Sequence, residues 1–308
     1  MKTAVIGVGK LGKIHARIYT ELEEYKLVGL CDPVKPEEEN LQGIPWVADY
    51  RELLELGVEA VSIATPTIHH HEVARFFLEN GIHCLIEKPI AMNMDEAQDL
   101  LDLAKEKNLF LMVGMVERFN NAYSEARKQV ENPMFIESHR LGPFPNRSLD
   151  ISVVLDLMIH DLDIIMDLVD DEVVSVEGVG VKALTDKADI ANARLHFKKG
   201  CIANITASRV SDEPMRRTRV FFNHNYISLD FMESTIKSLK VNENGLERKN
   251  LTIEKLEPLK REILHFHAGI KSLPHDYTLA KNAAMALDLA LKIEEDLTHR
   301  QNAMQATA

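Results

Sequence analysis

A glycine-rich turn near the start of the chain constrains its fold more strongly than any other sequence feature. Gly7, Gly9 and Gly12 lie between a strand-like run at residues 3–6 and a helix-like stretch at residues 10–22. In a strand–turn–helix unit, the first glycine makes a tight turn, the second lets the backbone approach a pyrophosphate, and the third lets the helix pack closely on the strand. The anion binds at the N-terminus of the helix. The predicted dinucleotide contacts in this turn are Gly7, Gly9, Lys10, Leu11 and Gly12.

An acidic residue at the end of the second strand-like run indicates which dinucleotide binds. This run ends at Asp32, 20 residues after Gly12. A carboxylate at that position accepts hydrogen bonds from the ribose 2′-hydroxyl of NAD and repels the 2′-phosphate of NADP. Because strand, turn, helix, strand and acid follow in this order, we predict an NAD site rather than a surface turn that is merely rich in glycine.

The pattern of apolar residues changes along the chain and predicts two domains. Up to about residue 113, short β-rich runs alternate with helix-like segments, which is typical of a parallel sheet covered by helices. From about residue 119, consecutive β-type runs are joined by short turns, which predicts a mostly antiparallel sheet. The fold class is therefore α/β, with a doubly wound Rossmann domain at residues 1–118 and an α+β domain at residues 119–308. We expect an amphipathic C-terminal helix at about 276–297, packed back on the first domain.

Composition and charge exclude several classes of protein. Hydrophobic residues make up 45% of the 308 residues and charged residues 27%, which is the balance of a water-soluble globular chain. The formal charge is −12, so a phosphate backbone is repelled on average and we expect no nucleic-acid partner. No apolar run approaches the roughly 20 residues of a membrane span, and the N-terminus lacks the pattern of a signal peptide. We therefore expect a cytoplasmic protein with no membrane partner.

Two groups of potential metal ligands are present, and neither has the spacing of a metal site. Cys31, Cys84 and Cys201 are far apart and odd in number, which favours reduced buried thiols over disulfides or a cysteine-based site. The histidines at 69–71 are adjacent, and adjacent histidines rarely converge on one ion. We therefore expect no metal.

The run Glu87-Lys88-Pro89 ends a short apolar stretch with three residues that a buried strand does not continue. In a parallel sheet these residues lie at the carboxyl edge, where ligands of open α/β folds bind, so Lys88 is expected to face the nicotinamide. Proline cannot continue a central ladder and therefore stops the strand, with a cis peptide bond as one way of doing so. The alternative is an ordinary salt-bridged lysine at the end of a strand.

Asp156 and His160 form a second candidate pair. They are four residues apart, so on a helix they lie on one face, with Asp163 on the adjoining edge. The alternative is a solvated acidic face, but the residues around His160 are mostly apolar, and an unpaired imidazole there is costly.

The chain resembles the Gfo/Idh/MocA family of sugar oxidoreductases. The resemblance rests on AVIGVGKLGKIHA, ATPTIHHHEVA, GIHCLIEKPIA, VGMVERFN and VLDLMIHDLDII, which occur in the family's order and span most of the chain. It implies an N-terminal Rossmann domain and a second domain built on a large open sheet that binds substrate and mediates oligomerisation. It also implies NAD-dependent oxidation of a secondary hydroxyl of a sugar.

The resemblance assigns roles to individual positions. It carries Lys88, Asp156 and His160 onto the catalytic positions of the family. Oxidation of an alcohol requires a base for the hydroxyl proton and a donor to the oxygen, which suits an imidazole and an ammonium. The sequence leaves open whether Lys88 or His160 takes the proton. Further cofactor positions implied are Thr65, Pro66, His70, Glu87, Lys88 and Glu117.

Arginines in the second domain point to the substrate. Guanidinium groups suit a diphosphate, because they donate paired hydrogen bonds to its oxygens. Six arginines lie in two stretches of an otherwise acidic protein: Arg140, Arg147, Arg209, Arg216, Arg217 and Arg219. The substrate contacts we predict are Lys88, Arg118, Arg140, Arg147, Asp156 and His160. One departure from the family pattern is Met158, where the family usually has glycine, which predicts a bulkier pocket wall.

The segment at residues 139–164 resembles the family branch that oxidises the 3-hydroxyl of UDP-N-acetylglucosamine, whose product is transaminated on the way to certain lipid A molecules. A cyclitol or simple hexose dehydrogenase of the same family is one alternative. A non-catalytic NAD(H)-binding regulator is another, although such a protein is expected to lack the lysine or the histidine. The resemblance also implies a homodimer or homotetramer, formed through the exposed face of the second sheet.

Overall fold

The computed structural model describes residues 1–144, 151–243 and 245–306, the last six of these by their backbone alone. The chain forms two compact units. The first unit contains Met1–Met115 and Leu259–Ala284, and the second contains Val116–Pro258 and Met285–Ala308. The first division falls three residues before the predicted boundary at 118, and a C-terminal segment joins the first unit.

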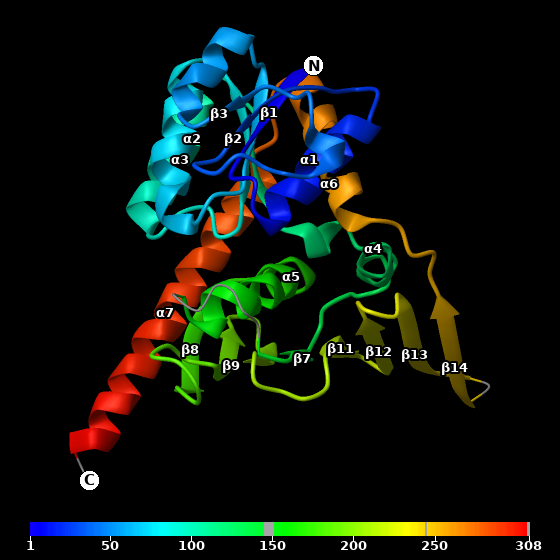
Figure 1. Ribbon diagram of the computed structural model, residues 1–308. Helices are drawn as coiled ribbons and strands as arrows, with labels where there is room; N and C mark the ends of the chain where they lie inside the picture. The colour runs from blue at the N-terminus through cyan, green and yellow to red at the C-terminus, as the bar shows by residue number, and fades with distance from the viewer. Residues whose placement is uncertain (145–150, 244, 307–308) are drawn as a thin grey trace. The chain divides into compact units, whose positions relative to one another are not determined.

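The first unit is built on a parallel sheet of six strands in the order β3-β2-β1-β4-β5-β6, which is the doubly wound topology that the sequence predicts (Figure 1). Residues of β4 and β6 are buried throughout, because helices cover both faces of the sheet. The strands are β1 (Lys2–Ile6), β2 (Lys26–Cys31), β3 (Trp46–Val47), β4 (Ala60–Ile63), β5 (His83–Glu87) and β6 (Leu111–Gly114).

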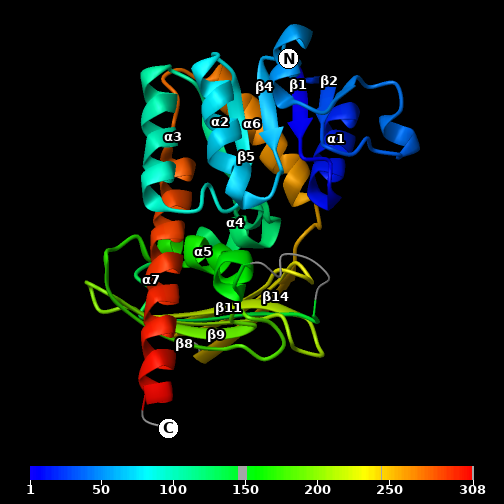
Figure 2. The same ribbon diagram turned by 60° about the vertical axis from the view of Figure 1, so that its left-hand side comes forward.

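Two pairs of helices cover this sheet. Figure 2 shows α2 (His70–Glu79) and α3 (Met94–Glu106) side by side on one face. The helices α1 (Lys10–Glu21) and α6 (Pro258–Lys271) lie on the other face. Phe266 of α6 stacks on Phe110, next to β6, with 5.9 Å between the ring centroids. The sequence analysis did not predict α6. Short 3-10 turns are η1 (Glu39–Leu41), η2 (Tyr50–Leu56) and η3 (Thr67–His69).

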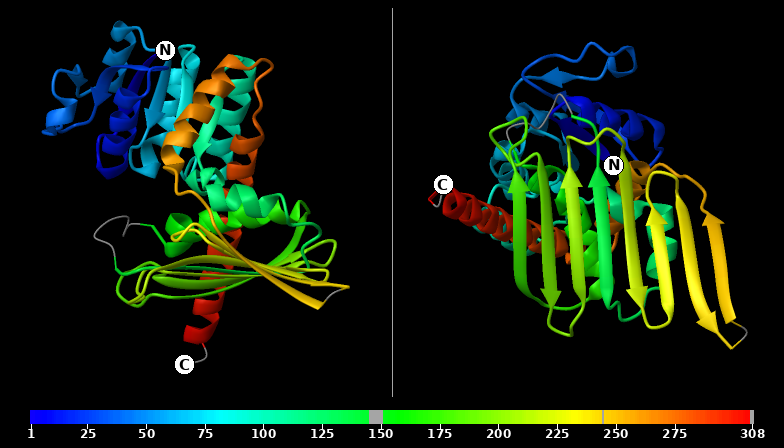
Figure 3. Two further views of the ribbon diagram at one scale, coloured as in Figure 1. Left: turned by 90° about the vertical axis from the view of Figure 1, so that its right-hand side faces the viewer. Right: turned by 90° about the horizontal axis from the view of Figure 1, so that it is seen from below.

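The second unit is built on a sheet of eight strands in the order β14-β13-β12-β11-β7-β10-β9-β8. Among the described strands, neighbours pair antiparallel except β7 and β10, which confirms a mostly antiparallel sheet. Figure 3 shows the strands of this sheet with one face open to the viewer. The strands are β7 (Phe135–Leu141), β8 (Val173–Val181), β9 (Ile190–Phe197), β10 (Ile202–Ser208), β11 (Met215–Phe222), β12 (Asn225–Asp230), β13 (Thr235–Asn242) and β14 (Gly245–Thr252).

Helices lie on the other face of this sheet. A π-helical turn, η5 (Val154–Met158), leads directly into α5 (Ile159–Val169), and both pack over the central strands (Figure 1). The last helix, α7 (Thr278–Ala306), is longer than predicted, and its second half lies against β8. A Cβ added at Gly180 would come within 3.0 Å of Leu297, so β8 carries glycine where this helix crosses it. The unit also contains η4 (Val116–Phe119) and α4 (Asn121–Arg127).

Two expectations from composition can be compared with the structure. All three cysteines are buried free thiols, as predicted. Within the described ranges, no helix has both the length and the apolar character needed to cross a membrane.

Candidate active site

The glycine-rich turn of the first unit has the geometry that its sequence pattern predicts. Gly7 adopts a φ of +82°, and a Cβ there would lie 2.6 Å from the backbone of Ala64. A Cβ at Gly12 would lie 1.8 Å from the carbonyl oxygen of Gly7. Both positions therefore require glycine, one for the turn and the other for the close approach of α1 to β1.

Gly9 differs from the other two glycines because a Cβ there would meet nothing within 4 Å. It is the N-cap of α1, and no side chain caps this end of the helix. A helix N-terminus that opens on free space suits an anion such as a pyrophosphate. Just after the end of β4, the hydroxyl Oγ1 of Thr65 is buried and has no hydrogen-bond partner within the described residues. Both observations fit a bound dinucleotide.

Asp32 lies directly after β2 and is held in place by the turn. Its Oδ2 accepts a hydrogen bond from the backbone N–H of Val8 at 2.7 Å, and its Oδ1 accepts one from Val34 at 3.0 Å. A carboxylate has about four acceptor positions, so these two bonds fix its orientation and leave capacity for the ribose hydroxyls of NAD. The carboxylate is thereby fixed next to the second residue of the glycine-rich turn.

His70 connects the ends of two strands. It opens α2, as the family resemblance implies, and it is 1% exposed. Its Nδ1 lies 2.8 Å from the carbonyl oxygen of Pro89, and its Nε2 lies 2.9 Å from that of Thr65. Burial lowers the pKa of His70, while hydrogen bonds to these two carbonyls oppose the shift. Both ring nitrogens thus contact backbone carbonyls, and the role of His70 at the cofactor stays a prediction.

The Glu87-Lys88-Pro89 run lies where the sequence predicts. Glu87 is the last residue of β5, and the Lys88–Pro89 peptide bond is cis. The backbone N–H of Lys88 donates to Oε2 of Glu87 at 3.2 Å. Glu87 itself is 9% exposed and contacts His15 of α1, a residue that the sequence analysis did not select. The available signal was its place in the AVIGVGKLGKIHA stretch, from which only residues of the turn at 7–12 were predicted to bind.

The second unit carries the other predicted catalytic residues on a distorted helix. Asp156 lies within the π-helical turn and is 4% exposed, and His160 is in the first turn of α5. The sequence analysis treated this segment as one regular helix. A π-turn closes its hydrogen bonds from i to i+5, so it changes the angle between side chains four residues apart. Met158 is fully buried, in the interior of this unit.

Arg118 belongs to a buried ion-pair network at the other end of α5. Its Nε and Nη2 donate to the two carboxylate oxygens of Asp163 at 2.6 and 2.8 Å. Its Nη1 lies 2.6 Å from a carboxylate oxygen of Asp167. The guanidinium, 8% exposed, is thus occupied by two acids of the same helix.

Arg140 and Glu117 are joined in a second buried network. Nε of Arg140 donates to Asp161 at 2.6 Å, and its Nη1 donates to Glu117 at 2.8 Å. Ser138 also donates to Asp161, at 2.8 Å. Asp161 was not selected from the sequence, where nothing distinguishes it from the other acids of α5. The network attaches this helix to β7.

Of the six arginines considered for a diphosphate, the five that the structure describes do not form one cluster. Side chains alternate between the faces of a strand, so Arg216 lies on the helix-covered face with Arg140, and Arg217 lies on the open face. Arg217 pairs with Asp230 at 2.7 Å. Arg219, also on the open face, pairs with Glu137 at 3.2 Å. Arg147 lies outside the described residues.

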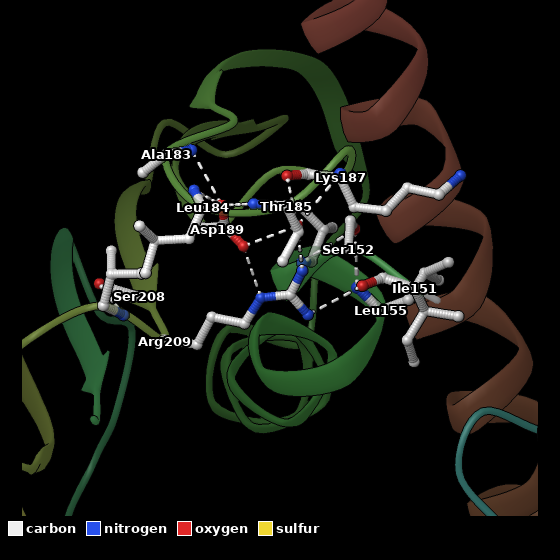
Figure 4. Close-up of polar contacts among 12 residues, drawn as sticks. Ile151, Ser152, Leu155, Ala183, Leu184, Thr185, Lys187, Asp189, Ser208 and Arg209 are labelled. Carbon is white, nitrogen blue, oxygen red and sulfur yellow. Dashed lines mark hydrogen bonds and ion pairs between the residues drawn. The ribbon is translucent and has the colours of Figure 1, made fainter. Parts of the chain in front are cut away.

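Arg209 anchors the segment that precedes Asp156. It is 1% exposed, and its three donor nitrogens contact Asp189, the carbonyl oxygen of Ile151 and Thr185, each at 2.9 Å (Figure 4). Ser152, the next residue, donates to Glu294 of α7 and accepts from the backbone N–H of Val154 at 3.1 Å. The start of the π-turn is therefore fixed by a buried cation and a serine cap.

Comparison with known proteins identifies the class. Residues 1–115 match the family model described as "Oxidoreductase family, NAD-binding Rossmann fold", and residues 123–228 match the "GFO/IDH/MocA C-terminal domain". The chain belongs to the Gfo/Idh/MocA family, and it is an NAD-dependent dehydrogenase built on the fold of that family. The predictions of family, fold class and cofactor are thereby confirmed.

Particular relatives are more informative than the family. The chain is 42% identical over 243 residues to UDP-N-acetylglucosamine 3-dehydrogenase of Acidithiobacillus ferrooxidans, covering 77% of this chain and 76% of that protein. A solved structure of that enzyme, GnnA, superposes with a TM-score of 0.88 at 36% identity and covers 96% of this chain and 97% of that one. The scyllo-inositol 2-dehydrogenase (NAD(+)) of Bacillus subtilis is 31% identical over 68% of each chain. A probable dehydrogenase from Thermotoga maritima, at 22% identity and a TM-score of 0.81, shares the fold over 97% of each chain.

Proposed function

We propose that the protein oxidises the 3-hydroxyl of UDP-N-acetylglucosamine, with NAD as the hydride acceptor. The observation that carries this proposal is the 42% identity to a UDP-N-acetylglucosamine 3-dehydrogenase over about three quarters of both chains, with likeness to its solved structure over nearly the whole length. The 3-keto product is a substrate for transamination, and we propose that it enters lipid A synthesis.

The proposed chemistry divides between a base and a donor. Bound NAD supplies the acceptor for the hydride that leaves carbon 3. One of Lys88 and His160 takes the hydroxyl proton, and the other donates a hydrogen bond to the oxygen as charge develops on it. Asp156 orients His160 and stabilises the charged form of its ring. Histidine is the usual general acid–base side chain near neutral pH, and an ammonium is a hydrogen-bond donor suited to a developing oxyanion.

The nucleotide part of the substrate needs a cation for its diphosphate. Of the described arginines in the two stretches, Arg216 is the most exposed, with 53% of its side chain accessible, and it lies 3.6 Å from Glu117. Arg118, Arg140 and Arg209 are buried and engaged with carboxylates, so we assign the first two to the support of α5 and Arg209 to the support of the segment before Asp156. We propose Arg216 as a diphosphate contact, with Arg147 kept as a prediction.

Purified protein with NAD tests the proposal directly. UDP-N-acetylglucosamine should generate NADH absorbance, whereas N-acetylglucosamine without the nucleotide should give at least about tenfold lower kcat/KM, since one lost charged contact of this kind is worth about 1.5–3 kcal/mol. The Lys88→Met variant should bind NAD with unchanged affinity and lose about 10²–10⁴ in kcat, the range typical of general acid–base groups. Unchanged turnover in Lys88→Met would exclude the proposed mechanism.

The relative from Bacillus subtilis supports a second candidate, a cyclitol dehydrogenase. The same assay decides between the two, because scyllo-inositol carries no diphosphate. If scyllo-inositol is oxidised with a higher kcat/KM than UDP-N-acetylglucosamine, the cyclitol assignment replaces the nucleotide-sugar assignment. The Arg216→Ala variant should then leave the activity unchanged.

We further propose that the protein works as a homo-oligomer in the cytoplasm. The open face of the second sheet carries an aromatic group, in which Phe221 lies between Phe135 and Tyr226 at centroid distances of 5.8 and 4.9 Å. Val179 and Val181, on the same face, are 55% and 54% exposed. Apolar side chains on an open sheet favour association with a second copy. Sedimentation of the full chain, with Phe221→Glu as the variant expected to dissociate it, tests this proposal.

A further inference from the structure

A chain of buried polar side chains links α1 to β4 and β5 in the first unit. It begins at Glu87, the last residue of β5, and passes directly to His15 on α1. From His15 it continues through Ser62 of β4 to Tyr19, also on α1. Nε2 of His15 lies 2.9 Å from Oε1 of Glu87, and Nδ1 of the same ring lies 3.2 Å from Oγ of Ser62. The hydroxyl of Tyr19 lies 2.6 Å from Oγ of Ser62. His15 is 1% exposed, and Ser62 and Tyr19 are 0% exposed. Bulk water therefore does not compete for these hydrogen bonds.

The bond between His15 and Glu87 has only one possible direction. Burial would raise the pKa of Glu87, but the hydrogen bond and charge of His15, together with the charge and backbone N–H of Lys88, hold it below its usual value. An ionised carboxylate only accepts hydrogen bonds, so Nε2 of His15 carries the proton. Nδ1 can accept from Ser62 in a neutral ring or donate to it in a charged one. In both cases Nε2–H donates to Glu87.

Glu87 is held on three sides. Its Oε1 accepts from His15, its Oε2 accepts from the backbone N–H of Lys88, and its carboxylate lies over Gly114 of the neighbouring strand β6. A Cβ at position 114 would come within 3.2 Å of that carboxylate. The carboxylate is therefore hydrogen-bonded by donors from α1 and from Lys88 and packed against the backbone of β6. Because Lys88 is the next residue, the direction of its backbone depends on this arrangement.

We propose that His15 is a positioning residue for Lys88. Its Nε2–H fixes the carboxylate of Glu87, and the carboxylate fixes the backbone of Lys88 at the carboxyl end of β5. The helix that begins at the dinucleotide-binding turn is thus coupled to the lysine that acts on the substrate hydroxyl. This role rests on the proposed function in its assumption that Lys88 contacts the substrate.

A pair of amide variants isolates the bond to Glu87 from general disruption of the core. In His15→Gln the side-chain amide nitrogen can reach the place of Nε2, and in His15→Asn it reaches the place of Nδ1, on the Ser62 side. The two variants are matched in polarity, and only the first keeps a donor to Glu87. We expect His15→Gln to keep kcat within about fivefold of the original protein, and His15→Asn to lose about 10²-fold, the effect of a misplacement of about 1 Å at a reacting group. KM for NAD should change by less than about threefold in both.

The Ser62→Ala variant is the control for the same buried layer. It removes the partner of Nδ1 and keeps the bond to Glu87, so kcat should fall by less than about threefold. Equal losses of kcat in His15→Gln and His15→Asn, or a larger loss in Ser62→Ala than in His15→Asn, would overturn the positioning role. Far-ultraviolet circular dichroism and NAD affinity confirm that each variant is folded.

A spectroscopic measurement separates this inference from the proposed function. In protein labelled with carbon-13 at the lysine ε-carbons, the Lys88 signal is assigned by its loss in Lys88→Met. We expect this signal to shift in His15→Asn and to stay in place in Ser62→Ala, whatever the substrate is. If no sugar is oxidised and the shift is present, the proposed function fails and the positioning role stands. If the sugar is oxidised and the Lys88 signal is the same in all variants, the positioning role fails alone.

Discussion

The two units hold the residues of their candidate sites in different ways. At the strand ends of the first unit, most of these contacts join a side chain to backbone, as Asp32 does with Val8 and His70 with the carbonyls of Thr65 and Pro89, and the buried pair of His15 and Glu87 is a charged exception. Around α5 of the second unit, buried arginines bind buried carboxylates, as Arg140 does with Asp161. The first arrangement depends on local backbone geometry, and the second depends on charge.

The difference has an energetic consequence. A backbone contact within a turn is specified by the residues of that turn, and its loss exposes or strains only a small region. A buried ion pair contributes little net stability, yet removal of one partner leaves an uncompensated charge. Single substitutions should therefore destabilise the second unit more than the first, whereas ligand binding should be more sensitive in the first.

The largest expected effect is the removal of a buried cation in the second unit. Arg140→Leu leaves Asp161 and Glu117 without their guanidinium, so the free energy of unfolding should fall by about 3–5 kcal/mol. Urea unfolding followed by circular dichroism measures the loss. The control is Arg219→Leu, which removes a pair whose side chains are both 33% exposed and should cost less than about 1 kcal/mol. Equal losses in the two variants would remove the distinction between buried and exposed pairs.

A smaller effect is expected when the first unit is overpacked. Gly114→Ala places a methyl group 3.2 Å from the carboxylate of Glu87, which His15 prevents from moving away. The free energy of unfolding should fall by about 1–3 kcal/mol, as for other overpacked sites. Gly142→Ala is the control, because a Cβ at that position meets nothing within 4 Å. A Gly114→Ala protein as stable as Gly142→Ala would show that the Glu87 carboxylate is free to rotate.

A third substitution should change ligand binding and leave folding intact. Gly9→Ala adds a methyl group in open space at the N-terminus of α1, where the pyrophosphate is expected. The dissociation constant of NAD should rise about tenfold, equivalent to about 1.4 kcal/mol. The stability of the free protein should change by only a few tenths of a kcal/mol, as for a small change at an N-cap. Calorimetric titration gives the first quantity, and an unchanged affinity would contradict the placement of the cofactor.

The smallest effect concerns acid stability, where the two units should differ in pH window. His83 accepts a hydrogen bond from the backbone N–H of Phe110 at 2.8 Å, and burial, with the nearby His275, lowers the pKa of His83 to about 4. The unfolded chain binds this proton near pH 6.5, so stability is lost as the pH falls from about 6.5 towards 4. We expect a loss of about 1 kcal/mol after solvent screening.

The corresponding group of the second unit titrates at lower pH. Burial would raise the pKa of Asp189, but backbone N–H groups of Leu184 and Thr185, with Arg209, hold it well below its usual range. Its contribution is present above the unfolded pKa of about 3.9 and is lost as the pH falls further.

The His83→Asn variant tests the prediction for the first unit, because it keeps an acceptor for Phe110 and cannot be protonated. It should therefore abolish the decrease between pH 6.5 and 4, as measured by urea midpoints, and a persistent decrease would assign it to other groups.

The sequence allowed prediction of the parts that depend on short segments. The positions of Gly7, Gly12 and Asp32 follow from a strand, a turn and a helix within about 30 residues, because each glycine is required by a contact inside that unit. The end of β5 at Glu87 was likewise predictable, since proline stops the strand. The helix α6 could have been found from Leu259, Ile263 and Phe266, which have helical spacing and are buried.

The parts that were not predicted depend on residues distant in the sequence. Nothing near Arg140 shows that its partners are Glu117 and Asp161, because the pairing is set by how β7 and α5 pack. The arginines of the second domain were considered together for a diphosphate because sequence proximity does not show which face of a strand a side chain takes. His15 was similarly overlooked, since its partner Glu87 is 72 residues away.

In the π-helical turn at Val154–Met158, each hydrogen bond spans one residue more than in a regular helix. We expect deletion of a single residue there to let the backbone close into ordinary α-helical hydrogen bonds while Ile159–Val169 keeps its packing on the sheet. The carboxylate of Asp156 would nevertheless swing round the helix axis, away from its present direction. A change of length by one residue in this segment would therefore change the direction of the Asp156 side chain without requiring a change in the packing of α5.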